Sequence, residues 1–421
     1  MKRVVGVPED GIDVGLAARA WLEAEWDPEA ALAEWRTKLA LSGWGCPTWP
    51  RRWCGRDLPV ASASIVTAEF DRMGAVGPAE GVGMNLAAPT ILEHGSDELK
   101  ERFILDTVIG RVNWCQLFSE PDAGSDLAGL RTTAERDGDE WVVSGQKLWS
   151  TSAHHADFGL LLARTDWDVP KHRGITYFVL PMDQPGVDVR PLRQMNGHAS
   201  FNEIFLDQAR VPAANVVGGA GQGWAVALST LAHERRLASN RRVSSVPAQG
   251  RVQREAAFEA AVVAEPYSWY PQRAGRVDLV IERARATGRD GDPVVRQQIA
   301  ALMALAWSAR WTNQRAAAAR AVGRPPGPEG SLGKLASSNI ARAASRVHSL
   351  IAGASGMLAG DDGPMGGTIT EVLVSVPAVS IAGGTDEIQR NILGERILGL
   401  PREPFTDRDR PFRHVAATGG W

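Results

Sequence analysis

Residues 116–126 read Gln-Leu-Phe-Ser-Glu-Pro-Asp-Ala-Gly-Ser-Asp, a stretch dense in small and turn-forming residues. A loop of this composition can bring main-chain N–H groups and hydroxyls against a planar or phosphorylated ligand. The same composition is also typical of a loop that is simply solvated. Two later segments belong with it: residues 147–151 read Lys-Leu-Trp-Ser-Thr, and residues 381–391 read Ile-Ala-Gly-Gly-Thr-Asp-Glu-Ile-Gln-Arg-Asn.

The first two segments lie in a stretch whose pattern is typical of β structure. Short β-prone runs recur there with turn residues between them, at 134–143, 158–164, 174–180, 187–191 and 201–206. The first of these runs is predicted to be a hairpin of two strands that flank the Asp-Gly turn at 137–138. Helical patterns precede this stretch at 16–41 and 97–108 and follow it at 293–322, 332–352 and 387–398. The sequence therefore predicts an α+β protein with an N-terminal helical domain (1–111), a middle β domain (112–215) and a C-terminal helical bundle (216–421).

Composition excludes several classes of function. The chain has 421 residues with a net charge of -3, so it carries no broad basic surface for nucleic acid. No apolar run is long enough to span a membrane, and the N-terminus does not resemble a signal peptide. Three cysteines and no paired Cys or His spacing argue against a disulfide framework or a metal site. We expect a cytoplasmic protein, and we read His154-His155 as a loop and Met303 with Trp307 as core.

The three segments, in this order and on a helical–β–helical chain, resemble those of the acyl-CoA dehydrogenase family. The resemblance covers roughly residues 32–401 and implies FAD as cofactor and an acyl-CoA thioester as substrate. Matched residue by residue, it places the following residues at the cofactor: Gln116, Phe118, Ser119, Ser125, Trp149, Ser150, Thr151, Thr385 and Glu387. It also places Ser125 near the CoA phosphates, and Thr385 is a plausible helix N-cap.

The reaction of the family needs a base that removes the proton α to the thioester. Many members carry that base as a Glu directly before Gly-Thr in the last segment, where this chain has Gly383. Gly383 has no side chain to act as a base, and only its N–H can donate to the thioester oxygen. The resemblance also implies that the next residue, Gly384, contacts the substrate. The alternative position in the family, on the first helix of the C-terminal domain, matches Glu234, and Arg235 matches an acyl-CoA contact.

A helix places Glu234 on one stripe with Ala227, Leu231 and Ala238, so its carboxyl is expected to be partly desolvated, with its pKa raised toward that of a general base. The alternative is a structural ion pair with a neighbouring arginine. Gly383 also leaves open a non-catalytic partner subunit, and the fold is compatible with an oxidase or a monooxygenase. With the dehydrogenase interpretation, we expect oxidoreductase activity in lipid metabolism and an electron acceptor such as an electron-transfer flavoprotein.

The chain departs from the family where one subunit usually reaches its neighbour's flavin. Homodimeric members carry Arg-x-x-Phe-Gly there, whereas residues 285–293 read Arg-Ala-Thr-Gly-Arg-Asp-Gly-Asp-Pro. Extra residues lie around 251–276, and Val-Ser-Val-Pro at 374–377 replaces a common Arg-Asp pair. We therefore expect an oligomer, with a homologous second subunit completing the flavin site.

Overall fold

The computed structural model describes residues 9–237, 250–321, 327, 329–402 and 409–418. They divide into two compact units. The first contains the N-terminal helices, the β sheet, the helices up to Pro266 and the C-terminal helix. The second contains the helices from Tyr267 onward, together with the short segment 193–199 between two strands.

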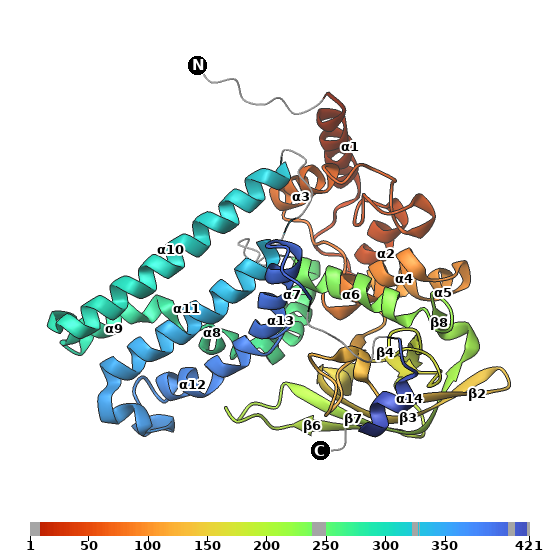
Figure 1. Ribbon diagram of the computed structural model, residues 1–421. Coiled ribbons are helices and arrows are strands. Elements are labelled where there is room, and N and C mark those ends of the chain that lie inside the picture. The colour runs from red at the N-terminus through yellow and green to blue at the C-terminus, as the bar shows by residue number, and fades with distance from the viewer. Residues whose placement is uncertain (1–8, 238–249, 322–326, 328, 403–408, 419–421) are drawn as a thin grey trace. The chain divides into compact units, whose positions relative to one another are not determined.

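The N-terminal part of the first unit consists of helices (Figure 1). They are α1 (Glu9–Glu25), α2 (Leu32–Ser42), α3 (Ser62–Met73), the π-helix Gly83–Ala87, α4 (Ala88–His94) and α5 (Asp97–Val108). The single helical pattern predicted for 16–41 is in fact two helices, because Pro28 in the intervening turn cannot continue a helix. Helix α5 begins where Ser96 Oγ accepts a hydrogen bond from the Leu99 N–H at 3.2 Å.

The β structure of the first unit is one mixed, eight-stranded sheet. Its strands are β1 (Trp114–Leu117), β2 (Thr133–Asp137), β3 (Glu140–Thr151), β4 (Phe158–Arg164), β5 (Ile175–Pro181), β6 (Val187–Leu192), β7 (Phe201–Pro212) and β8 (Val216–Val217). The order is β6-β7-β3-β2-β4-β5-β8, and β1 pairs with β4 in parallel. The predicted hairpin is confirmed, since β2 and β3 pair across Gly138, whose φ of 60° suits a tight turn.

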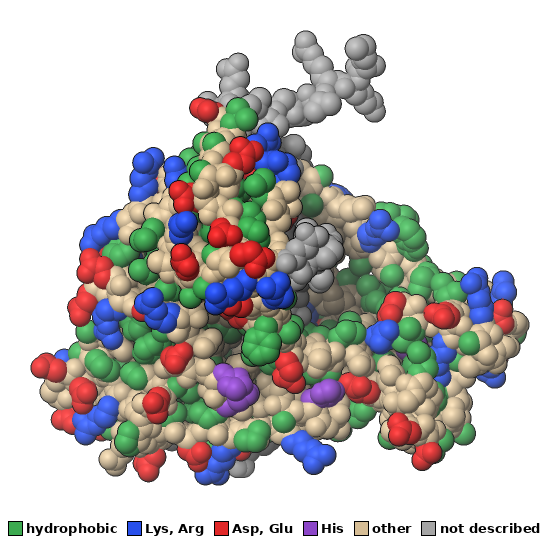
Figure 2. Space-filling model, turned by 180° about the vertical axis from the view of Figure 1, so that it is seen from behind, with side chains coloured by type: hydrophobic (Ala, Val, Ile, Leu, Met, Phe, Trp, Pro, Cys, Tyr) green, Lys and Arg blue, Asp and Glu red, His purple; other side chains and the backbone are tan. Residues whose placement is uncertain are grey.

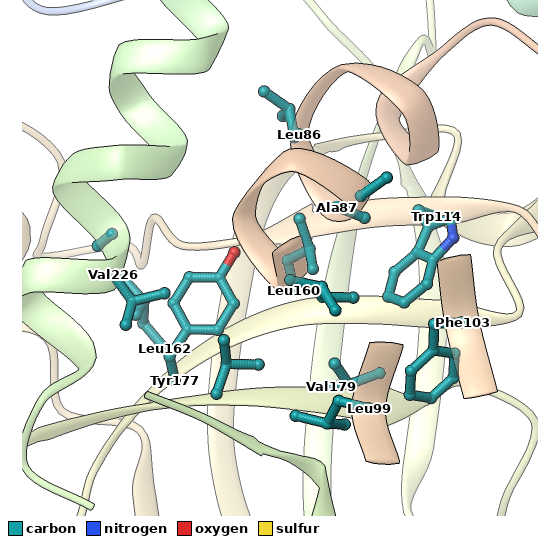
Figure 3. Close-up of a cluster of buried hydrophobic side chains, with 14 of the residues drawn as sticks. Leu86, Ala87, Leu99, Phe103, Trp114, Leu160, Leu162, Tyr177, Val179 and Val226 are labelled. Carbon is teal, nitrogen blue, oxygen red and sulfur yellow. The ribbon is translucent and has the colours of Figure 1, made fainter. Parts of the chain in front are cut away.

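Strands β4 and β5 carry the centre of the hydrophobic core, and their side chains are buried on both faces. One face packs Leu160, Leu162 and Tyr177 against the helices, and Figure 3 shows these side chains beside Val226 of α6 (Gly223–Leu237). The other face packs Leu161 and other residues against β3 and β7. Burial on both faces explains why β4 reads as a continuous apolar run rather than an alternating one.

Helix α6 is fixed to the sheet by polar contacts as well as apolar ones. The Tyr177 hydroxyl lies 3.1 Å from Thr230 Oγ1, which lies 3.0 Å from Thr90 Oγ1 of α4. All three side chains are fully buried, so each hydroxyl must find its hydrogen bonds within the protein. This network holds the helix one turn before the position of Glu234.

The extra segment near 251–276 is helical, and its first part belongs to the first unit. Helix α7 (Arg251–Ala264) packs on α2, where Glu255 accepts a hydrogen bond from the Leu32 N–H at 2.8 Å. Glu259 pairs with the buried Arg36 at 2.6 Å. The short α14 (Phe412–Thr418) also joins this unit, with the Phe412 ring 3.6 Å from the Arg164 guanidinium carbon.

The second unit is helical. It contains α8 (Tyr270–Arg273), α9 (Val280–Ala286), α10 (Pro293–Ala321), α11 (Glu329–Ala352), α12 (Thr368–Ser375) and α13 (Asp386–Arg396). Its core forms where Val295 and Leu302 of α10 meet Val347 of α11, and Met303 packs at its edge as predicted. The prediction for Trp307 was wrong, since 47% of its surface is exposed. The more buried face of α10 runs through Leu302, Ala306 and Ala309, and Trp307 lies outside it.

The α+β class and the helical–β–helical order are confirmed. Among the described helices, none is long and apolar enough to cross a membrane. Acidic and basic side chains are interspersed on the face shown in Figure 2, as the near-neutral net charge predicts.

Candidate active site

The loop at 116–126 leaves β1 and is tied back onto strand β3. The Leu148 N–H donates to the Ser119 carbonyl at 2.9 Å, and Ser150 Oγ donates to the Gln116 carbonyl at 2.8 Å. Ser119 and Leu148 are 29 residues apart in the sequence (148 minus 119), yet these bonds place the loop and the strand side by side. The sequence prediction that both segments serve one site requires this proximity.

Within the loop, the predicted cofactor residues differ in what they can offer. The Phe118 ring is buried and meets Tyr177 edge to face at 5.8 Å, so it packs in the core rather than on an open surface. Gln116 and Ser119 are half-buried, and Ser125 is exposed. Beside Ser125, Asp126 is held by Lys171 at 2.7 Å, which fixes the far end of the loop.

Strand β3 is irregular where the predicted flavin-covering residues lie. Its pairing with β7 shifts register between Lys147 and Ser150, and Trp149 there has a φ of 63°. This left-handed conformation is uncommon for a bulky residue and marks a constrained position. It leaves the Trp149 side chain 55% exposed, with its ring edge to face against Phe201 at 5.6 Å.

Ser150 and Thr151 follow Trp149 on β3 with different environments. Ser150 is 1% exposed and its hydroxyl is already bonded to the Gln116 carbonyl, so that hydroxyl serves the loop contact. Thr151 is half-buried and pairs with Phe201. Of the three predicted residues, Trp149 presents the largest open surface.

A buried ion pair joins the loop at 116–126 to strand β3, and the sequence alone did not identify it. Lys147 Nζ is 2.7 Å from Glu120 Oε1, and the two side chains are 0% and 7% exposed. Burial by itself would raise the pKa of Glu120, but the Lys147 charge and hydrogen bonds from Thr132 and Arg131 hold it below its usual value. The available signal was a lysine inside an apolar strand pattern, which requires a buried partner.

The candidate base Glu234 lies near the end of α6, in the same unit as the loop. Its stripe is only partly buried: Ala227 is fully buried, Leu231 packs at the edge of the core, and Glu234 is half-buried. Its neighbour His233 lies 3.4 Å from Glu93 of α4. Ala238 and the side chain of Arg235 lie outside the described residues, so the stripe is observed over its first three positions.

The last predicted segment lies in the second unit, at the start of α13. Gly383 and Gly384 have φ of 68° and 85°, both in the left-handed region that favours glycine. The prediction that Thr385 caps the helix is confirmed, since its side chain accepts a hydrogen bond from the Ile388 N–H at 3.3 Å. Glu387 is exposed and faces Arg390 at 3.3 Å.

The residues of the first unit fit a flavin in their chemistry. An aromatic ring that is half exposed, held in a constrained backbone, offers a wall for a planar ring system, and half-buried Ser119 and Gln116 offer polar groups beside it. The rings of His154 and His155 lie 4.0 Å apart, and His154 Nδ1 lies within hydrogen-bond distance of Asn202 Oδ1, at 3.1 Å. In the described part of the chain, no three acidic, His or Cys side chains are grouped to hold a metal ion.

Fold and segments together define a flavin-dependent oxidoreductase of helical–β–helical architecture. The family models for the acyl-CoA dehydrogenase N-terminal, middle and C-terminal domains match residues 16–111, 115–209 and 272–398. The chain therefore belongs to the acyl-CoA dehydrogenase family, and its reaction class is the dehydrogenation of acyl-CoA thioesters.

Curated relatives agree with this assignment. Acyl-CoA dehydrogenase IpdE1 of Mycobacterium tuberculosis is 35% identical, over 88% of each chain. Acyl-CoA dehydrogenase FadE34 of the same organism is 35% identical, over 96% of this chain but only 52% of its own length.

Among solved structures, the ChsE4-ChsE5 complex from Mycobacterium tuberculosis is 26% identical, with a TM-score of 0.62 over 95% of this chain and 100% of that chain. A variant of the Tcur3481-Tcur3483 steroid ACAD is 25% identical, with a TM-score of 0.62 over 94% of this chain and all of that one. The names of both structures join two different protein names, and the first is described as a complex.

Proposed function

We propose that this protein dehydrogenates an acyl-CoA thioester with FAD as cofactor and Glu234 as the base. Two observations carry the proposal: position 383 is a glycine, which has no side chain to act as a base, and α6 carries a half-buried carboxylate at Glu234. Helix α6 is anchored to the sheet by the Thr230 and Tyr177 hydroxyls, in the same compact unit as the loop at 116–126 and Trp149. A carboxylate on such an anchored helix can be held at a fixed position for proton transfer.

The roles of the other residues follow from what each one exposes. Trp149 would cover one face of the flavin, and Gln116, Ser119, Thr151, Thr385 and Glu387 would provide polar contacts to it. The side chains of Phe118 and Ser150 are buried, so these residues would contribute to the flavin site only through their main chain and by holding the loop against the strand. Ser125, Arg235 and Gly384 would contact the acyl-CoA.

In the reaction, Glu234 takes the proton from the carbon α to the thioester. The Gly383 N–H, with no side chain in its way, can donate to the thioester oxygen and stabilise the charge that develops there. When bound, FAD would supply the acceptor for the hydride that leaves the β carbon, so that a carbon–carbon double bond would remain. An electron-transfer flavoprotein would be a suitable acceptor for the electrons.

Substitution of Glu234 by Gln tests the assignment of the base. It should keep flavin bound and lower the rate of flavin reduction by acyl-CoA on the order of 10²- to 10⁴-fold, because the amide cannot accept the proton. Rapid mixing without oxygen, monitored by flavin absorbance, measures that rate. Glu93→Gln is a matched control on the neighbouring helix and should change the rate less than threefold.

An unchanged rate in Glu234→Gln would place the base elsewhere. Absence of flavin reduction with every acyl-CoA tried, both in the wild-type protein alone and in its complex with a co-expressed homologous subunit, would favour the non-catalytic partner subunit that Gly383 leaves open. The steroid ACAD relative makes polycyclic acyl-CoAs the first substrates to test, beside straight and branched ones.

We also propose that the chain works in the cytoplasm and pairs with a homologous second subunit. Cys46, Cys54 and Cys115 are all free thiols, which suits a reducing compartment. Support for the pairing comes from the complexes among the solved relatives and from Trp307 and Trp311, which are 47% and 60% exposed. These two side chains line an open groove on α10 with Ala304 and Ser308.

A further inference from the structure

The Glu120–Lys147 pair is a buried, hydrogen-bonded ion pair that the proposed reaction does not use. Lys147 Nζ donates to Glu120 Oε1 at 2.7 Å and to the Phe118 carbonyl at 3.2 Å. Glu120 also accepts from the Arg131 N–H at 2.6 Å and the Thr132 N–H at 2.9 Å. One lysine and one glutamate thus connect the start of the loop, the residues that follow it and strand β3.

Stability alone gives little reason to keep such a pair. Removing two ions from water costs several kcal/mol per ion, and replacing a buried pair by apolar residues of similar volume is often neutral or stabilising. A buried pair can instead fix one geometry among several that an apolar contact would allow. Here the pair lies where the loop at 116–126 meets strand β3, so the geometry in question is the position of the loop along that strand.

Lys147 is the last residue of β3 in regular register with β7 before the bulge that contains Trp149. Directly after it, the Leu148 N–H and the Ser150 hydroxyl bind the carbonyls of Ser119 and Gln116. The pair therefore fixes how far the loop lies along the strand at the point where Trp149 turns outward. A slip of one residue would move every side chain of this part of β3 to the opposite face.

A second buried cation supports the other side of the loop. The Arg164 guanidinium donates to the carbonyls of Leu130 at 3.1 Å and Ala128 at 2.7 Å. It is fully buried, and the ring of Phe412 covers it. Buried charged groups thus hold both the loop itself, through Glu120, and the residues 128–130 just beyond its end.

We propose that Glu120 and Lys147 are positioning residues for the flavin: they hold the loop at 116–126 and the bulge at Trp149 in the relative geometry that binds the cofactor. This inference rests on the proposed function, in which those two segments contact the flavin. The pair acts through Ser119 and Trp149 and does not itself touch the cofactor.

The test measures the dissociation constant of FAD by titration of the flavin-free protein, alone and in complex with a co-expressed homologous subunit, together with the absorbance spectrum of the bound flavin. Lys147→Met and Glu120→Gln should each weaken FAD binding at least tenfold and shift the spectrum. The matched control is Arg36→Met, which breaks the buried pair with Glu259 far from the loop in sequence and should lower the melting temperature without changing either flavin measurement.

The double variant Lys147→Met with Glu120→Gln separates a pair from two independent residues. If the two act together, the double variant should bind FAD more tightly than the sum of the two single effects predicts, because neither charge is left alone. Effects that simply add would show two independent residues and would contradict the action of a pair. If Lys147→Met does not fold, Glu120→Gln carries the test, because its amide oxygen can still accept a hydrogen bond from the Thr132 N–H, whereas its NH2 group cannot accept from the Arg131 N–H.

A third variant, Trp149→Ala, distinguishes the failure of this inference from the failure of the proposed function. If Trp149→Ala weakens FAD binding while Lys147→Met and Glu120→Gln stay within twofold of wild type with unchanged spectra, the positioning role is wrong and the flavin site stands. If Trp149→Ala also leaves FAD binding unchanged, the proposed flavin site is wrong, and the inference fails with it.

Discussion

Asp386 shows how one buried carboxylate can organise the last of the three predicted segments. It follows Thr385 directly and is 2% exposed, with Lys334 Nζ at 2.9 Å, Ser338 Oγ at 2.7 Å and Arg342 Nη1 at 2.9 Å. Burial by itself would raise its pKa, but these charged and hydroxyl donors lower it to about 2. Asp386 therefore binds the start of α13 to α11.

Substitution of Asp386 by Asn should destabilise the protein on the order of 2 kcal/mol near neutral pH, because charge-assisted hydrogen bonds are lost. The pKa of an aspartate in the unfolded chain is about 3.9, and the folded value is lower. The stabilising contribution is therefore present above about pH 4 and is lost as the pH falls toward 2. Melting temperatures of both proteins between pH 7 and pH 3 check this.

The gap between wild type and Asp386→Asn should be constant above about pH 5 and narrow below pH 4. The exposed Asp361, in the same unit, provides the control: Asp361→Asn should leave the melting temperature nearly unchanged throughout. A gap that stays constant down to pH 3 would contradict the assignment to Asp386.

At the scale of the secondary-structure element, β3 and α13 both place candidate site residues at a point where regular structure begins or ends. Strand β3 does so through the bulge after Lys147. In helix α13 that point is the N-cap, where the Thr385 side chain accepts a hydrogen bond from the Ile388 N–H, which has no partner within the first helical turn. Residues at such points keep main-chain groups available for a ligand while the element holds them in place.

Substitution of Thr385 by Ala should destabilise the first turn of α13 by about 1 kcal/mol, because the Ile388 N–H loses its acceptor. Hydrogen–deuterium exchange of residues 386–396 should then be faster by about fivefold, since 1.4 kcal/mol corresponds to about tenfold. Thr385→Ser retains the hydroxyl and should exchange like wild type. Equal exchange in Thr385→Ala and wild type would show that the cap does not hold the turn.

At the scale of the whole molecule, candidate site residues are divided between two compact units, and the second unit exposes aromatic surface. Trp307 and Trp311 on α10 lie 5.9 Å apart, with the Arg310 guanidinium 5.1 Å from the Trp307 ring. Large exposed aromatic side chains flanked by an arginine are typical of protein–protein interfaces. This surface agrees with the loss of the usual Arg-x-x-Phe-Gly contact segment at 285–293.

Expressed alone, the protein should therefore not form a stable homo-oligomer with one flavin per chain. Co-expressed with a homologous subunit it should form a mixed complex, and Trp307→Glu with Trp311→Glu should weaken that complex at least tenfold, because charges would be buried at the interface. Native mass spectrometry measures both. Phe258→Glu, at a residue that is 74% exposed on α7, is the control and should leave assembly intact. A stable homo-oligomer with full flavin content would refute the pairing.

The amino-acid sequence alone determined the order of helical and β regions, the family, the hairpin at Gly138 and the N-cap at Thr385. These depend on local periodicity and on short motifs, which any chain carries in its sequence. The sequence also identified the three segments of the candidate site, because each is a continuous motif.

Only the tertiary structure decided which of those residues are open and which are used internally. It buried Phe118 and the Ser150 hydroxyl, left Trp149 and Trp307 exposed, and joined Glu120 to Lys147 beneath the loop. Burial and pairing depend on contacts between residues far apart in the chain, and Glu120 and Lys147 are brought together by the meeting of the loop with β3. A pattern within a short stretch of sequence does not predict a contact between residues 27 positions apart, so this ion pair is seen only in the folded structure.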